Sequence, residues 1–165
     1  EAVKMAHSAD VSVEAALGGA QVRDASLEQR EETLTNVASA REFALTTSVD
    51  AIAVAVGSYH GDVKDQEAII HYDLIQELKD NVPVSLVMHG CSFLGDYKLR
   101  KAAELGIAKF NVQGELLNAG MQAAKKNLLG KGGCISVAEL NKVIKDAYIG
   151  QLTGFMAAIG SVKRL

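Results

Sequence analysis

The chain has 165 residues, of which 48% are hydrophobic and 22% charged, and its formal net charge is −3. This length fits one domain or part of a larger one, and the composition excludes a disordered chain. The negative charge argues against a nucleic-acid partner, and no apolar run approaches the ~20 residues that span a bilayer. No signal peptide is recognisable, and two cysteines are too few for a disulfide framework. We therefore expect a cytoplasmic protein by default, or an organellar one if a targeting segment has been removed.

Strand-like and helix-like segments alternate along the chain. Residues 2–8 have the pattern of a helix end, and a polar loop is expected over 18–35. Alternating apolar residues, or short continuous apolar runs, predict four strands. These predicted strands cover residues 11–17, 51–56, 82–88 and 107–112. Apolar residues at helical spacing predict four further helices and a long final one. Three of them have a candidate N-terminal cap, at Thr35, Asp96 and Ser136.

Four strands separated by helices predict a parallel α/β sheet with right-handed crossovers. A sheet of this kind is either a small doubly wound fold or half of an eight-stranded (β/α)8 barrel. In both folds the chemistry lies at the C-terminal ends of the strands. The predicted strand ends are residues 14–18, 57–61, 89–92 and 111–115.

Two histidines stand at neighbouring predicted strand ends. His60 and His89 could share a metal ion, since imidazole is a common zinc ligand. The alternative is that both are ordinary loop histidines. The residues that follow them can contact an anion through backbone N–H groups, a hydroxyl or a positive charge. These residues are Gly61, Lys64, Gly90 and Ser92.

Five separated motifs, in this order, carry a resemblance to a known family. They are VSVEAALGG, T-x-x-x-x-A-x-x-F, VDAIAVAVGSYHG-x-x-K, VPVSLVMHGCS and LRKAAELGIAKFNVQGEL. This series is very similar to the class II, metal-dependent ketose-bisphosphate aldolases of the fructose- and tagatose-bisphosphate type, over roughly residues 1–125. The resemblance implies the C-terminal half of a TIM barrel plus a C-terminal helix. Residues 1–130 would form the half-barrel from its fourth strand onward, and residues 134–165 a helical extension of the same domain.

The resemblance also implies an activity and roles for particular residues. The activity is reversible aldol cleavage of a ketose bisphosphate to dihydroxyacetone phosphate and an aldehyde, as in carbohydrate metabolism. Zn²⁺ is the implied cofactor, with a monovalent cation also compatible. His60 and His89 match zinc ligands. The residues that match substrate or phosphate contacts are Glu14, Gly61, Lys64, Gly90, Ser92 and Asn111.

Several positions depart from the family pattern. Ala16 and Gln21 replace two acids, and Gly114 replaces a threonine. In the motif that begins at His89, Cys91 and Phe93 bring Cβ atoms that we expect to obstruct the phosphate. The family's third zinc histidine and catalytic aspartate belong to a strand that would precede Glu1. We therefore name no catalytic residue and do not expect these 165 residues alone to be active.

Three hypotheses follow. The first is an aldolase domain whose N-terminal half is missing here or supplied by another chain. The second is an inactive, aldolase-derived structural or assembly subunit that has lost its zinc. A weaker third is another phosphate-binding half-barrel, such as an isomerase. Because four parallel strands leave two open edges, we expect this segment to pack against the missing half, a partner subunit or a second copy, as a homo- or hetero-oligomer.

Overall fold

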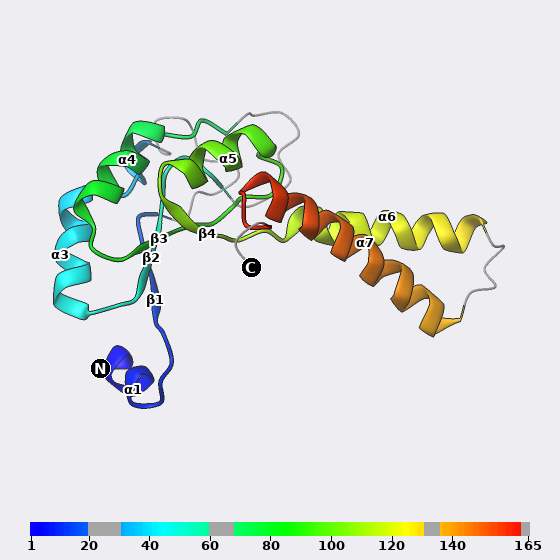
Figure 1. The fold of residues 1–165 in the computed structure, drawn as a ribbon, viewed down its shortest axis with the longest axis horizontal. Helices are drawn as coiled ribbons and strands as arrows, with labels where there is room; N and C mark the ends of the chain where they lie inside the picture. The colour runs from blue at the N-terminus through cyan, green and yellow to red at the C-terminus, as the bar shows by residue number, and fades with distance from the viewer. Residues whose placement is uncertain (20–30, 60–67, 131–135, 163–165) are drawn as a thin grey trace.

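The computed structural model describes residues 1–19, 31–59, 68–130 and 136–162. Four short strands form one parallel sheet in chain order (Figure 1). They are β1 (Glu14–Leu17), β2 (Ala51–Val54), β3 (Ser85–Met88) and β4 (Ile107–Phe110). The predicted parallel α/β arrangement is confirmed. A doubly wound sheet reverses its strand order at a switch point, whereas this order is sequential, as in a barrel.

Helices connect the strands and follow them. They are α1 (Ala2–Ser8), α3 (Val37–Thr47), α4 (Tyr72–Asn81), α5 (Asp96–Glu104), α6 (Gly114–Gly130) and α7 (Val137–Ala158). The predicted strands were too long at their ends, since Val82 is the extended residue that ends α4, and β2 stops at Val54. The expected loop over 18–35 is not loop throughout, because residues 31 and 32 are helical.

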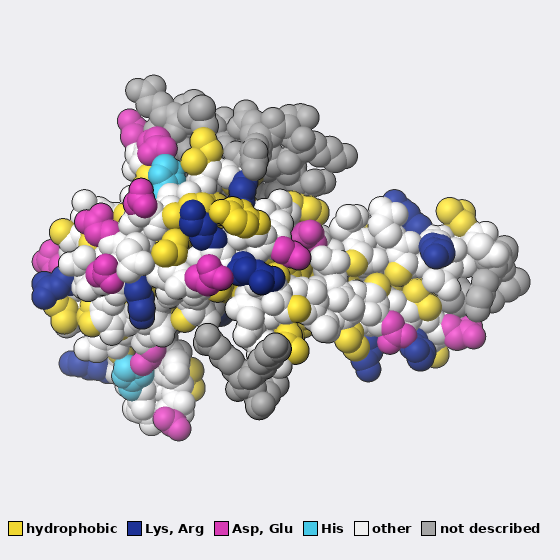
Figure 2. Space-filling view, turned by 45° about the horizontal axis from the view of Figure 1, so that its top comes forward, with side chains coloured by type: hydrophobic (Ala, Val, Ile, Leu, Met, Phe, Trp, Pro, Cys, Tyr) yellow, Lys and Arg dark blue, Asp and Glu magenta, His cyan; other side chains and the backbone are white. Residues whose placement is uncertain are grey.

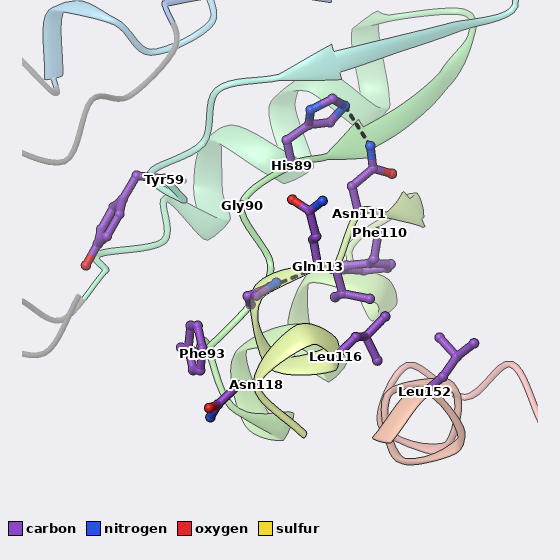
Figure 3. A pocket seen from close by; sticks show the side chains of 13 residues that line it. Tyr59, His89, Gly90, Phe93, Phe110, Asn111, Gln113, Leu116, Asn118 and Leu152 are labelled. Atoms are coloured by element: carbon purple, nitrogen blue, oxygen red, sulfur yellow. Dashed lines mark hydrogen bonds between the residues drawn. The ribbon is translucent and has the colours of Figure 1, made fainter. Parts of the chain in front are cut away.

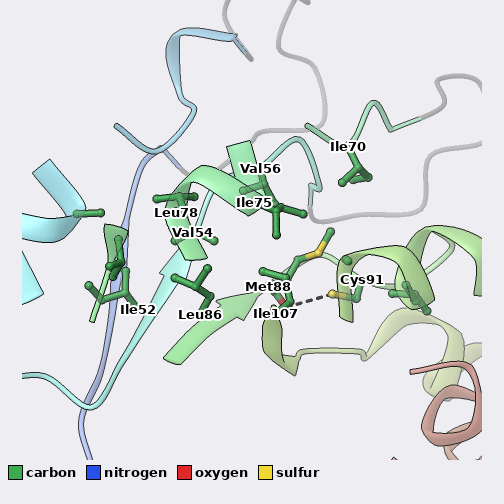
Figure 4. Close-up of a cluster of buried hydrophobic side chains, with 14 of the residues drawn as sticks. Ile52, Val54, Val56, Ile70, Ile75, Leu78, Leu86, Met88, Cys91 and Ile107 are labelled. Carbon is green, nitrogen blue, oxygen red and sulfur yellow. Dashed lines mark hydrogen bonds between the residues drawn. The ribbon is translucent and has the colours of Figure 1, made fainter. Parts of the chain in front are cut away.

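The core lies between the sheet and its covering helices (Figure 4). Alternate strand residues point to it, including Ile52, Leu86 and Met88, which are at most 1% exposed. Ile75 and Leu78 of α4 meet them, and neither is exposed at all. The other face of the sheet carries Glu14, and its apolar residues Ala53 and Val87 are at most 6% exposed, so the continuous apolar runs correspond to burial on both faces.

Two predicted helix caps are wrong. Asn36, not Thr35, caps α3, because its side chain accepts a hydrogen bond from the Ser39 N–H at 2.9 Å. The Thr35 hydroxyl is used between strands β1 and β2 instead. Gly95, not Asp96, is the N-cap residue of α5, and Asp96 lies in the first turn of the helix. The third cap is confirmed, since Ser136 and Glu139 form a reciprocal capping box at the start of α7.

Helices α6 and α7 form an antiparallel pair that projects from the sheet as an arm (Figure 1). The end of α7 returns to the sheet layer, where Phe155 and Ala158 are buried. Along the arm, hydrophobic atoms reach the surface (Figure 2). Its exposed apolar side chains include Leu117, Met121, Leu128 and Ile149. None of the helices among the described residues is long and apolar enough to cross a membrane.

Candidate active site

A pocket of about 750 Å³ opens at the C-terminal ends of β3 and β4 (Figure 3). Most of its lining comes from two segments, residues 89–93 after β3 and residues 110–118 around the start of α6. The lining residues are Tyr59, His89, Gly90, Ser92, Phe93, Phe110, Asn111, Val112, Gln113, Gly114, Leu116, Asn118 and Leu152. The predicted residues His89, Gly90, Ser92 and Asn111 are therefore brought together at one end of the sheet.

His89 lies between a carboxylate and an amide. Its Nε2 is 3.0 Å from Glu14 Oε1 and 3.0 Å from Asn111 Nδ2. The two partners select opposite tautomers, because Nε2 donates to a carboxylate but must accept from an amide N–H. The bond to the charged carboxylate is the stronger of the two, which favours a proton on Nε2. The lone pair of the neutral ring then lies on Nδ1.

Glu14 is fixed from both sides. Its other oxygen, Oε2, accepts a hydrogen bond from Lys109 Nζ at 2.6 Å. Burial alone would raise the pKa of the Glu14 carboxyl, but the hydrogen bonds and charges of Lys109 and His89 outweigh it, so this pKa lies below its ordinary value. Glu14 is therefore a carboxylate at neutral pH, able only to accept.

Glu14 reaches this site from an unexpected position. It is the first residue of β1 and not, as expected, a residue at the end of a strand. Its side chain still meets His89, which follows β3, because the strands of a barrel are tilted and staggered. Lys109 belongs to β4, two residues before Asn111, so both side chains lie on the same side of that strand.

The loop after β3 is packed closely against the loop after β2. Ser58 is 8% exposed and donates its hydroxyl hydrogen to the His89 carbonyl at 2.7 Å. Gly90 has φ +64°, and a Cβ atom there would stand 2.6 Å from the Tyr59 carbonyl oxygen. Only glycine fits this approach, so the loop carries His89 on a well-defined backbone.

Two side chains tie this same loop to the start of α6. Ser92 Oγ accepts hydrogen bonds from the N–H groups of Gln113, at 3.1 Å, and Gly114, at 2.9 Å. In return, Glu115 Oε2 accepts one from the Phe93 N–H at 2.9 Å. The arrangement is similar to a capping box, but it joins two segments distant in the sequence, and the Glu115 carboxylate accepts from the N–H of Phe93 instead of that of Ser92. It fixes one wall of the pocket.

The expectation that Cys91 obstructs a phosphate is wrong. Its side chain points into the core, where Cys91 is fully buried (Figure 4). The thiol donates a hydrogen bond to the Met88 carbonyl at 3.1 Å, and burial raises its pKa to about 12. Cys91 is therefore a protonated core residue and not a metal ligand or reactive thiol. Phe93, in contrast, does line the pocket.

His89 fits a role as a metal ligand. A histidine that ligates a metal commonly donates its other N–H to a carboxylate, which orients the ring, and Glu14 is placed to accept it. Within the part of the chain that the structure describes, no group of three or more His, Cys, Asp or Glu residues could hold a metal ion. His60, Gly61, Lys64 and Gln21 lie outside the described residues. A complete ligand set thus requires residues beyond those described.

Some site residues were missed from the sequence. Lys109 is the charged residue within the short strand sequence IAKF, two positions before Asn111, and this spacing was the available signal. Glu115 and Tyr59 stand within two of the five motifs quoted above, but neither was given a role. Their roles depend on contacts with the loop after β3, which sequence periodicity does not show.

Comparisons with known proteins agree with this geometry. A model of the class-II fructose-bisphosphate aldolase family matches residues 1–164. Among solved structures, the YdjI aldolase from Escherichia coli K12 is similar, with 30% identity and a TM-score of 0.82, over 99% of this chain and 55% of that one. The fold is also shared with a fructose-bisphosphate aldolase from Campylobacter jejuni, with 13% identity and a TM-score of 0.79, over 99% of this chain and 56% of that one.

The fold and site thus define the C-terminal half of a TIM barrel of the aldolase class. The chain belongs to the class-II fructose-bisphosphate aldolase family. It spans about half the length of these solved relatives.

Proposed function

We propose that this chain contributes to a metal-dependent aldolase that reversibly cleaves a phosphorylated ketose, with a ketose bisphosphate as the first substrate to test. The observation that supports this proposal is His89, whose Nε2 lies 3.0 Å from Glu14 Oε1 with Asn111 beside it, at the strand ends of a chain that matches the aldolase family. Because the chain spans about half of its solved relatives, the activity is proposed for the complete barrel.

In this proposal His60 and His89 are zinc ligands, completed by residues outside the described part of the chain. The bound metal would supply a Lewis acid that polarises the substrate carbonyl. Glu14 orients the His89 ring, and the Asn111 amide faces the pocket, where it could hydrogen-bond a substrate oxygen. Gly61, Lys64, Gly90 and Ser92 are the proposed phosphate contacts. Gln21 cannot move a proton, so another residue has to serve as the acid or base.

The test measures metal content and turnover together. The protein would be purified with any chain that copurifies, and its zinc measured by elemental analysis. Cleavage of fructose and tagatose 1,6-bisphosphates would be followed by reduction of the released dihydroxyacetone phosphate. We expect near-stoichiometric zinc and measurable turnover, with both reduced in His89→Ala.

His7→Ala is the matched control. His7 is also a surface histidine that hydrogen-bonds a carboxylate, Asp50, at 2.9 Å, but it lies on α1 and does not line the pocket. This variant should keep both zinc and turnover. Zinc-free protein without turnover would overturn the proposal and favour the alternative of a structural or assembly subunit, for which Ala16 and Gln21 are the motivating departures.

A further inference from the structure

Two aliphatic hydroxyl side chains are buried among the described residues, and both lie near the C-terminal ends of strands. They are Thr35, which is 3% exposed, and Ser58, which is 8% exposed. Burying a hydroxyl costs free energy unless it makes hydrogen bonds. Thr35 Oγ1 joins Leu17, at the end of β1, to Ala55 after β2. Ser58 Oγ instead bonds directly to the backbone of the proposed metal ligand, since it donates to the His89 carbonyl at 2.7 Å.

The backbone that carries Ser58 is itself held in place. The His71 N–H donates a hydrogen bond to the Val56 carbonyl at 3.0 Å. Gly57 has φ +101°, and a Cβ atom there would stand 1.8 Å from the Ile69 carbonyl oxygen. The chain at residue 57 therefore packs against residue 69 with no room for a side chain. As a result, the Ser58 hydroxyl reaches the loop after β3 from a backbone that neighbouring contacts fix on both sides.

The paired residues of β2 and β3 end just before His89. The last pair is Val54 and Met88. On the side of β4, backbone bonds continue past this point, because the Asn111 N–H donates to the Met88 carbonyl at 2.9 Å and the Cys91 N–H donates to the Asn111 carbonyl at 3.3 Å. On the side of β2, the Ser58 hydroxyl bonds to His89 beyond the last pair. The loop after β3 is thus held from both neighbouring strands.

We propose that Ser58 is a positioning residue for His89. Its hydroxyl fixes the backbone from which the imidazole extends, while Glu14 orients the ring itself. This inference rests on the proposed function, since it assigns a second support to the proposed zinc ligand. Ligand distances in metal sites vary by only about 0.2 Å, so a small displacement of the His89 backbone weakens metal binding. Without the Ser58 hydroxyl, the His89 carbonyl also loses this hydrogen-bond donor.

The first test compares zinc affinity in wild type, Ser58→Ala and Ser58→Thr, by competition with a chelator. The protein would be purified with any chain that copurifies. Ser58→Ala should lower the affinity about tenfold, at the lower end of the range for residues that support a metal ligand. Ser58→Thr keeps the hydroxyl and should restore the affinity to within about twofold of wild type.

Thr35→Val is the matched control. It also removes a buried hydroxyl at the same end of the sheet, but one whose bonds go to Leu17 and Ala55 and not to the loop that carries His89. Its zinc affinity should stay within about twofold of wild type, even though the variant is less stable. Melting temperatures of all variants would separate a general loss of stability from a local change at His89.

The second test needs no metal. In metal-free protein, the ring nitrogen chemical shifts of His89 should differ between wild type and Ser58→Ala, because the ring then sits differently against Glu14 and Asn111. Thr35→Val should keep the wild-type ring shifts. This signal reports the position of the His89 side chain, which a loss of stability alone does not change.

A zinc affinity of Ser58→Ala within about twofold of wild type would overturn the inference. An equal loss in Thr35→Val, or a loss that Ser58→Thr does not restore, would also overturn it, since either result would show disturbed packing only. If wild type holds no zinc, the proposed function fails, and the ring shifts of His89 in metal-free protein then decide the inference by themselves.

Discussion

Replacing Glu14 by Gln tests the proposed metal ligand most directly. The substitution keeps the shape of the side chain but removes the charged acceptor 3.0 Å from His89 Nε2 and the partner of Lys109. Loss of the group that orients a ligating histidine lowers metal affinity by roughly 10–100-fold. The Lys109 pair adds little, about 0–1 kcal/mol, because its side chain is 56% exposed. We therefore expect Lys109→Met to weaken zinc binding by no more than about fivefold.

Zinc affinity would be measured by competition with a chelator. The expected order of loss is Glu14→Gln, then Lys109→Met, with Lys109→Arg close to wild type. Lys142→Met is the matched control, since Lys142 forms an equally short pair with Asp146, at 2.6 Å, on the arm. In metal-free protein, nitrogen chemical shifts of His89 should show that Glu14→Gln changes the ratio of the two tautomers. An affinity for zinc within twofold of wild type in Glu14→Gln would refute the positioning role.

Three further predictions concern residues around the site. Thr35→Val should lower the free energy of unfolding by about 2–4 kcal/mol in denaturant titrations, because Thr35 is 3% exposed and its hydroxyl hydrogen-bonds one backbone group of each of two strand ends, at 2.6 and 2.7 Å. Cys91 should react with iodoacetamide at pH 8 at least about 100-fold more slowly in native than in urea-unfolded protein, because burial raises its pKa to about 12. Asp50→Asn should speed hydrogen exchange of the Val13 N–H, because this N–H donates a hydrogen bond to the charged Asp50 Oδ2 at 2.7 Å.

The Thr35 prediction has a matched control variant, and the raised or lowered pKa values of Cys91 and Asp50 each imply a direction of pH dependence. Thr35→Ser keeps the hydroxyl and should cost clearly less than Thr35→Val. The raised pKa of Cys91 means that its contribution to stability is complete below the unfolded pKa near 9 and is lost as pH rises toward 12. The hydrogen bond from His7 holds the pKa of Asp50 below its ordinary value, so the Asp50 contribution is lost as pH falls through that lowered pKa. Native labelling of Cys91 as fast as in urea would contradict its burial.

The sequence carried much of the fold because the relevant patterns are local. Apolar runs and helical spacing identified four strands and the helices that connect them, and Ser136 correctly marked the start of α7. The errors fell at segment ends. Thr35 has a side chain suited to an N-cap, but its hydroxyl bridges the ends of β1 and β2, and the next residue caps α3 instead. The preference of threonine for N-cap positions is a local property, so it cannot show that the Thr35 hydroxyl bonds to residues 18 and 20 positions away instead.

The contacts of the site likewise include some that the sequence predicts and some that only the tertiary structure shows. That His89 and Asn111 lie together was determined by the sequence itself, because both follow predicted neighbouring strands and parallel strands end at the same edge of a sheet. Only the tertiary structure placed Glu14 against His89, 75 residues away, and against Lys109, 95 residues away. Only the tertiary structure shows that the Cys91 side chain is buried in the core and that the Phe93 ring lies against Gly114. These contacts depend on strand tilt, register and the direction of single side chains, and a one-dimensional pattern of residue types does not contain those quantities.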